Sequence, residues 1–141
     1  YLPYEMVHPR SMVVDNAGNL YVANVCSVLK VPVFGPATVI AGSLVECGST
    51  DGAAPDARFN QLSGLAIDSN GTIFVSDTLN HTIRKISTTG VVTTVAGTLG
   101  SAGVIPGVLP GGLNQPVGMA IDATGALYTT SENAVLKIVL P

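Results

Sequence analysis

One eleven-residue pattern of apolar and polar positions occurs three times along the chain, at residues 12–22, 65–75 and 119–129. In each copy, two short apolar runs flank a four-residue turn with Asp at its first position and Gly at its fourth. The turn aspartates are Asp15, Asp68 and Asp122, so the copies are 53 and 54 residues apart. A fixed period of this kind is typical of repeat architectures. It predicts the fold of the scaffold but says little about what the scaffold binds.

The apolar runs predict short β-strands. They are rich in β-branched residues, bounded by Gly, Asn and Asp, and show no sustained helical period. The turns suit hairpins with a type I turn and a bulge, in which the Asp side chain caps the turn and Gly accepts positive φ. We therefore predict structural caps at Asp15, Asp68 and Asp122. The expected strands are 12–15, 20–24, 28–31 and 38–41; then 64–67, 72–75, 82–86 and 91–96; then 118–122, 126–131 and 135–139.

Four antiparallel strands per repeat predict an all-β fold, a β-propeller built from four-stranded blades. About three blades fit the chain: blade one at 8–42, blade two at 60–97 and blade three at 114–141. Residues 1–7 have no place in blade one. We expect them to serve as a closing outermost strand for the last blade of a neighbouring half.

The second unit resembles the NHL repeat. The resemblance rests on residues 64–97, which contain Asp77-Thr78-Leu79-Asn80-His81-Thr82-Ile83-Arg84-Lys85-Ile86, and on the linker 51–64. Units one and three are two residues shorter between their second and third strands and lack the Asn-His pair. NHL repeats typically form six-bladed propellers, and three blades cannot close a ring. The resemblance implies further blades, from another copy or from a longer chain.

Composition narrows the functional classes. The chain has 141 residues, a net charge of −3 and only 11% charged residues, without the clustered basic surface of a nucleic-acid binder. No apolar run approaches the roughly 20 residues that span a bilayer. We expect an extracellular or secreted protein. Because the first residue is Tyr1, we also expect a processed product or a piece of a longer protein.

Two features would follow from an oxidising, secretory environment. Cys26 and Cys47 are the only cysteines; they either pair or are small buried hydrophobes, and secretion favours a disulfide. Asn70 and Asn80 each begin an N-glycosylation pattern at a predicted turn. We therefore expect a disulfide and accessible glycans on a secreted glycoprotein.

The sequence contains no motif that is typical of a catalytic site. There is no Gly-x-Ser-x-Gly elbow and no phosphate loop, so we expect no catalytic residue and no cofactor. Some NHL-like lyases hold zinc with histidines around the central channel. A zinc site needs at least three protein ligands, and this chain has only His8 and His81. The resemblance instead implies that His81 fixes its blade through a side-chain hydrogen bond.

The linkers between units supply the remaining candidates. Phe59 is expected to anchor adjacent blades by wedging between them, and Arg58 to pair with Asp51 or Asp56. We expect the long loops 42–60 and 97–114 to lie on one face. The second loop is uncharged and apolar, which fits either a contact surface or a flexible glycine-rich loop.

These patterns favour a non-enzymatic β-propeller scaffold for protein–protein interaction or extracellular assembly, with other propeller blades as partners in an oligomer or a longer polypeptide. The alternative is half of a propeller lyase or hydrolase with a central-channel site. That alternative predicts polar inner strands, whereas 12–14, 65–67 and 119–121 are apolar. A third interpretation is RNA binding, which some NHL domains perform. It predicts a basic top face, and the net charge of −3 argues against it.

Overall fold

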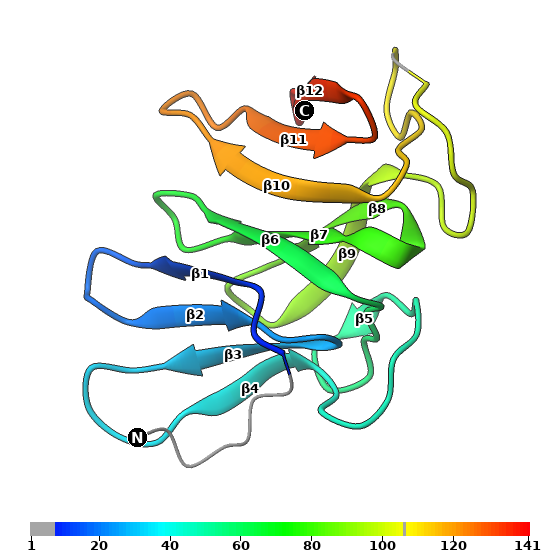
Figure 1. Ribbon diagram of the computed structural model, residues 1–141. Helices are drawn as coiled ribbons and strands as arrows, with labels where there is room; N and C mark the ends of the chain where they lie inside the picture. Colours follow the sequence, from blue (N-terminus) through cyan, green and yellow to red (C-terminus); the bar gives the residue numbers. More distant parts are fainter. Residues whose placement is uncertain (1–7, 106) are drawn as a thin grey trace.

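Three antiparallel sheets make up the computed structural model, which describes residues 8–105 and 107–141 (Figure 1). Each sheet is one blade, and the predicted all-β propeller fold is confirmed. Blade one contains β1 (Ser11–Val14), β2 (Leu20–Ala23), β3 (Ser27–Val31) and β4 (Thr38–Gly42) in that order. Blade three contains β10 (Pro116–Ile121), β11 (Leu127–Ser131) and β12 (Ala134–Ile138). Residues 1–7, the predicted closing strand, lie outside the described residues.

Blade two has five strands in the order β5-β9-β8-β7-β6. Four were expected: β6 (Leu62–Ile67), β7 (Ile73–Asp77), β8 (Thr82–Ile86) and β9 (Val91–Gly97). The fifth, β5 (Gly52–Ala53), belongs to the linker and pairs with the outer edge of β9. A one-turn 3₁₀ helix, η1 (Thr78–Asn80), occupies the longer connection between β7 and β8. The linker therefore covers an edge that would otherwise expose unpaired backbone groups.

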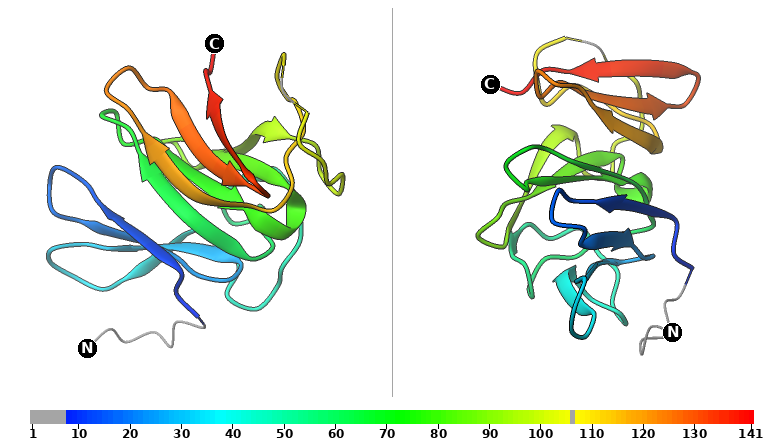
Figure 2. Two further views of the ribbon diagram at one scale, coloured as in Figure 1. Left: turned by 45° about the horizontal axis from the view of Figure 1, so that its top comes forward. Right: turned by 90° about the vertical axis from the view of Figure 1, so that its left-hand side faces the viewer.

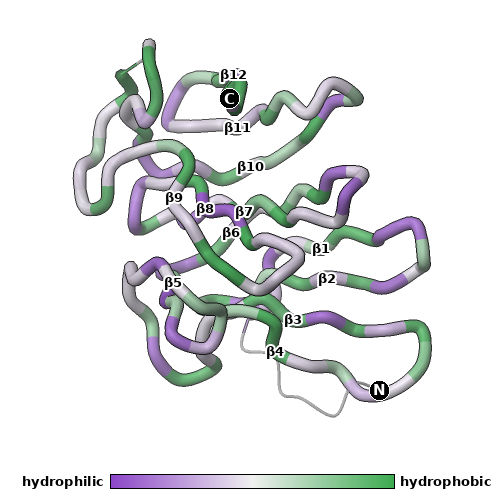
Figure 3. The backbone as a smooth tube through the Cα atoms, turned by 180° about the vertical axis from the view of Figure 1, so that it is seen from behind, coloured by the Kyte–Doolittle hydropathy of each residue, from purple (hydrophilic) through white to green (hydrophobic). Residues whose placement is uncertain are grey.

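The first strands of the three blades lie side by side. Strand β6 contacts both β1 and β10, and the rest of each sheet extends away from this row (Figures 1 and 2). This row corresponds to the inner rim of a propeller. Figure 3 shows hydrophilic segments at the hairpin turns, with apolar segments along the strands between them.

The three turn aspartates hold the hairpins between first and second strands. Each carboxylate accepts hydrogen bonds from the backbone N–H groups two and four residues later, at 2.8–3.1 Å. The hydroxyls of Tyr21 and Tyr128 also donate to the carboxylates of Asp15 and Asp122. The hydrogen bond from the Thr124 side chain is the largest of several that lower the pKa of Asp122 to about 2.

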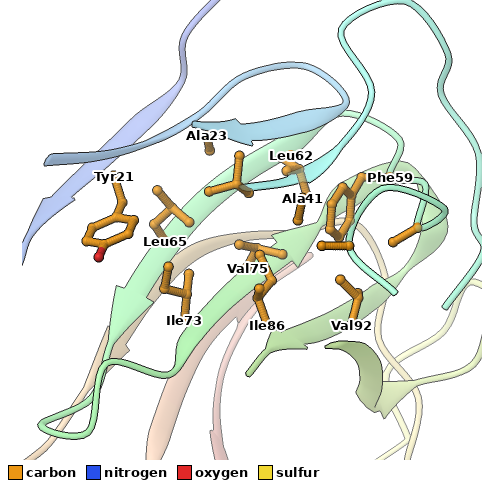
Figure 4. Packing of buried hydrophobic residues seen from close by; sticks show 13 residues of the cluster. Tyr21, Ala23, Ala41, Phe59, Leu62, Leu65, Ile73, Val75, Ile86 and Val92 are labelled. Carbon is orange, nitrogen blue, oxygen red and sulfur yellow. The ribbon is translucent and has the colours of Figure 1, made fainter. Parts of the chain in front are cut away.

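Hydrophobic side chains are buried between blades. One cluster joins blades one and two, with Phe59 fully buried in it (Figure 4). Its other labelled members come from both blades and the linker: Tyr21, Ala23, Ala41, Leu62, Leu65, Ile73, Val75, Ile86 and Val92. A second cluster joins Phe74, Ile83 and Ala96 of blade two to Leu127 and Ile138 of blade three. Phe59 thus lies where an inter-blade anchor was expected.

Replacing Phe59 by Ala is expected to lower the free energy of unfolding by about 3–5 kcal/mol, because it leaves a cavity between blades one and two. Phe34→Ala is the matched control, since Phe34 is 90% exposed, and should change stability by less than about 0.5 kcal/mol. Urea unfolding of both variants measures the difference. Equal losses would contradict the role of Phe59.

Acid should weaken the third hairpin turn in a defined pH range. The pKa of Asp122 is lower in the folded chain than its ordinary value of 3.8. The stabilisation is therefore complete above about pH 4 and is lost as the pH falls through about 2. Carboxyl-carbon NMR should show Asp122 titrating near 2, and titration at its ordinary value would contradict the cap.

Candidate functional site

Both long linkers lie on the side opposite the Asp-capped hairpin turns (Figure 1). We call this the loop-bearing face; it consists of residues 42–60, 78–81, 97–105 and 107–114. Asn80 connects the two linkers: its Nδ2 donates to the Gly48 carbonyl at 2.7 Å, and its own carbonyl accepts from Gly100 N–H at 3.4 Å. The longer β7–β8 connection of blade two therefore organises the surface on either side of it.

The first linker is fixed to blade two by Arg84 of β8, whose side chain is fully buried. Its Nε and Nη2 donate to Asp51 Oδ1 at 2.9 and 2.6 Å. Nη1 donates to Asp77 Oδ2 at 2.7 Å and to the Arg58 carbonyl at 3.1 Å, and Nη2 donates to the Thr50 carbonyl at 2.8 Å. With these bonds, all five guanidinium N–H groups can be satisfied without water.

Asp77, at the end of β7, is the buried partner of Arg84. Its carboxylate also accepts from Asn60 N–H and from Asn80 Nδ2, both at 2.8 Å. Burial raises the pKa of Asp77, and the bonds from Asn80, Asn60 and Arg84 oppose that shift. The cluster joins a strand end, η1 and the linker, and removing Arg84 would leave the Asp77 carboxylate in the interior without a charged partner.

Arg58 does not form the predicted ion pair with Asp51 or Asp56. It pairs with Glu46 at 3.1 Å, and its Nη1 donates to the carbonyls of Pro55 and Ala57. Asp51 instead belongs to Arg84. The Arg58 prediction was wrong because closeness in sequence favoured a local pair, whereas the fold brings Arg84 to the linker from 33 residues away.

A disulfide joins Cys26, in the β2–β3 turn, to Cys47 in the first linker, with Cα atoms 5.1 Å apart. The Cys26 carbonyl also accepts from Ser43 N–H at 3.1 Å. The linker is thus attached to blade one by the disulfide and to blade two by Arg84 and Asn80. Such cross-links reduce the freedom of the unfolded chain as well as fixing the folded loop.

His81 links blade two to blade three, because its Nδ1 accepts from Gln115 N–H at 3.1 Å. The other histidine, His8, belongs to blade one. Among residues 8–105 and 107–141, no three His, Cys, Asp or Glu residues are grouped as a metal site would require. The same residues include no helix with the length and apolar character needed to cross a membrane.

The two glycosylation patterns occupy different environments. Asn70 is exposed in the β6–β7 turn. Asn80 is buried, and its Nδ2, the atom that would carry a glycan, already bonds to Gly48 and Asp77. The prediction that both turns present an accessible asparagine was therefore wrong for Asn80.

The second linker is anchored but partly apolar on its outside. Leu109 and Leu113 pack into the cluster between blades two and three, and Ile105 exchanges backbone hydrogen bonds with Gly112. By contrast, Val108 is 93% exposed and the Ile105 side chain is also exposed. Val45 of the first linker is similarly exposed, so both linkers present branched apolar side chains to solvent.

Sequence reasoning missed Arg84 as the centre of this face. Arg84 lies within the expected strand 82–86, and its charge was given no role there. Thr82, Arg84 and Ile86 alternate along β8 and therefore point to the same face of the sheet, where all three are buried. A charged residue on the same face as an apolar strand residue was the available signal that Arg84 has a buried partner. Ser76 of β7, which bonds to blade three, lies just beyond the expected strand 72–75 and was likewise given no role.

Sequence comparison identifies the repeat. Residues 42–109 match the family model described as the teneurin NHL domain. NHL repeat-containing protein 2 of Gallus gallus is 40% identical over 96 residues, which are 66% of this chain and 13% of that protein. The chain belongs to the NHL-repeat β-propeller family. Protein SUPPRESSOR OF QUENCHING 1, chloroplastic, of Arabidopsis thaliana is 33% identical over 93 residues, which are 64% of this chain and 9% of that protein.

Solved structures share the arrangement of this NHL chain. A structural genomics protein of unknown function from Bacteroides thetaiotaomicron matches with a TM-score of 0.83 and 26% identity, over 92% of this chain and 34% of its own. An auxiliary nutrient binding protein from Bacteroides ovatus matches with a TM-score of 0.78 and 19% identity, over 90% of this chain and 35% of its own. Virginiamycin B lyase from Staphylococcus aureus matches with a TM-score of 0.64 and 17% identity, over 99% of this chain and 44% of its own. The chain therefore spans a third to under half of these neighbours and about a tenth of the curated relatives.

Replacing Arg84 by Met is expected to destabilise the chain by about 3–5 kcal/mol, because Asp77 would remain buried without its charge partner. Lys85→Met, at the next position of the same strand, is the control and should cost no more than about 1 kcal/mol. Chemical unfolding measures both losses. If the two variants lose the same stability, Arg84 does not hold the linker as described.

Proposed function

We propose that this chain is part of a non-enzymatic, extracellular NHL propeller scaffold that binds protein partners through its loop-bearing face. Further blades, from another copy or from a longer polypeptide, complete the ring. The observation that carries the proposal is the combination of firmly attached linkers with exposed apolar side chains at Val45, Ile105 and Val108. Exposed apolar surface on a rigid support is characteristic of interaction sites.

The composition of the inner rim favours a scaffold function rather than a lyase or hydrolase activity. Its exposed side chains include Met12 (68% exposed), Val14 and Val117, which offer no group for proton transfer. The likeness to virginiamycin B lyase, at 17% identity, concerns the fold. An apolar rim fits packing better than chemistry.

Two observations support an extracellular location. The Cys26–Cys47 disulfide is of a kind that persists in oxidising compartments. The matching family model describes a domain of the teneurins. An exposed Asn70 in a hairpin turn is compatible with secretion.

The test is photo-crosslinking from single positions. A photoreactive residue at Val45 or Val108 should give adducts of discrete mass with extracellular proteins, because both side chains face solvent on the loop-bearing face. The control is Thr88, exposed in the β8–β9 turn on the opposite side. Equal labelling from all three positions, or none from Val45 and Val108, would contradict the proposed face.

Secretion through a eukaryotic pathway should place a glycan on Asn70 and none on Asn80. Asn70→Gln is therefore expected to remove the whole glycan mass, measured on the intact protein with and without glycosidase. Thr82→Val, which destroys the Asn80 pattern, should leave that mass unchanged. A glycan that persists after Asn70→Gln would contradict this assignment.

A further inference from the structure

The joint between blades two and three combines hydrogen bonds with close backbone approach. Ser76 Oγ accepts from Gly64 N–H at 2.6 Å and donates to the Val117 carbonyl at 2.6 Å. Thr78 Oγ1 donates to the Pro116 carbonyl at 2.7 Å. A Cβ on Gly64 would collide with the Val117 carbonyl, so glycine is required where the two first strands meet.

Blade three carries the same half-joint on its far side, where no further blade covers it among the described residues. Thr130 corresponds to Ser76 and Gly118 to Gly64, each 54 positions later. Thr130 Oγ1 accepts from Gly118 N–H at 2.9 Å. Within residues 8–105 and 107–141, its hydroxyl proton has no acceptor across the joint. An open hollow of about 370 Å³ lies beside it, lined by Asn114, Gln115, Val117, Thr130 and Glu132.

The apolar part of this half-joint is also uncovered. Val135 pairs with Thr130 in the sheet as Ile83 pairs with Ser76. Ile83 is fully buried against blade three, whereas Val135 is 72% exposed. The far flank of blade three therefore repeats the hydroxyl of Ser76 and the apolar side chain of Ile83, whereas Glu132 takes the place of Thr78.

Blade one carries the complementary half. His8, Gln61 and Gln115 all have positive φ and occupy the same place before the first strand of each blade. Pro9 and Arg10 therefore correspond to Pro116 and Val117, whose carbonyls accept the Thr78 and Ser76 hydroxyls. Pro9 and Arg10 are exposed, and within the described part of the chain their carbonyls accept no side-chain hydrogen bond.

We propose that blade one of a second copy of this chain docks on the far flank of blade three, with Thr130 Oγ1 donating to the Arg10 carbonyl. The proposal rests on the proposed function, because it names which blades complete the scaffold. Charge favours this occupant: Glu132 borders the hollow, and Arg10 lies on the segment that would enter it. Two copies related by a twofold axis make the joint twice and close a six-bladed ring.

Sedimentation of the 141-residue chain over a range of concentrations tests the proposal. The wild type should be dimeric. Thr130→Val should raise the dimer dissociation constant about tenfold or more, because each ring loses two hydrogen bonds. Thr130→Ser should restore it. Thr93→Val is the matched control, since Thr93 is exposed on β9 away from both flanks and should leave the constant unchanged.

A charge exchange gives an independent readout, with circular dichroism confirming that every variant is folded. Arg10→Glu and Glu132→Arg should each weaken the dimer, and the double variant should recover it. A monomeric wild type, or charge variants that do not compensate, would overturn the proposal. If the chain is monomeric but a photoreactive residue at Val108 gives adducts with extracellular proteins, only the second copy as occupant is overturned. If the double charge variant recovers the dimer but Val108 gives no such adducts, only the proposed interaction face is overturned.

Discussion

A single sheet has two faces, and each blade of this protein can bury a face only against another blade. Both hydrophobic clusters combine side chains from adjacent blades and the linker between them. Hydrophobic burial is therefore a property of the joints between blades. Blade two is covered on both faces, and this explains why its strands are the most uniformly buried. The stability of blades one and three depends on the blade beside them.

Polar groups within and beside these joints determine how the blades and linkers are oriented. Arg84 and Asp77 are buried together and are satisfied by each other, by Asp51 and by backbone carbonyls. A buried ion pair adds little net stability, but an incomplete one is strongly unfavourable. The linker therefore has one position in which every charge is paired. The same requirement holds the first linker, which carries the exposed Val45 of the loop-bearing face.

The features that could be predicted from the sequence are those set by short-range interactions that recur in every repeat. The turn aspartates act within four residues of themselves, so the hairpins, the strands and the propeller fold followed from their spacing. Arg84 could not be assigned in this way, because its partner Asp51 is 33 residues away and only the fold brings them together. Strand β5 contains two residues, too few for a pattern. The Asn80 pattern failed because a sequence motif carries no information on burial.

Amide hydrogen exchange measured strand by strand tests the dependence of each blade on its neighbours most directly. If burial resides in the joints, amides of β7 and β8, in the blade covered on both faces, should exchange most slowly. Those of β12, whose sheet is covered on one face, should exchange faster by orders of magnitude. Equal protection in β8 and β12 at a concentration where the chain is monomeric would contradict the account, because it would show that each blade is stable by itself.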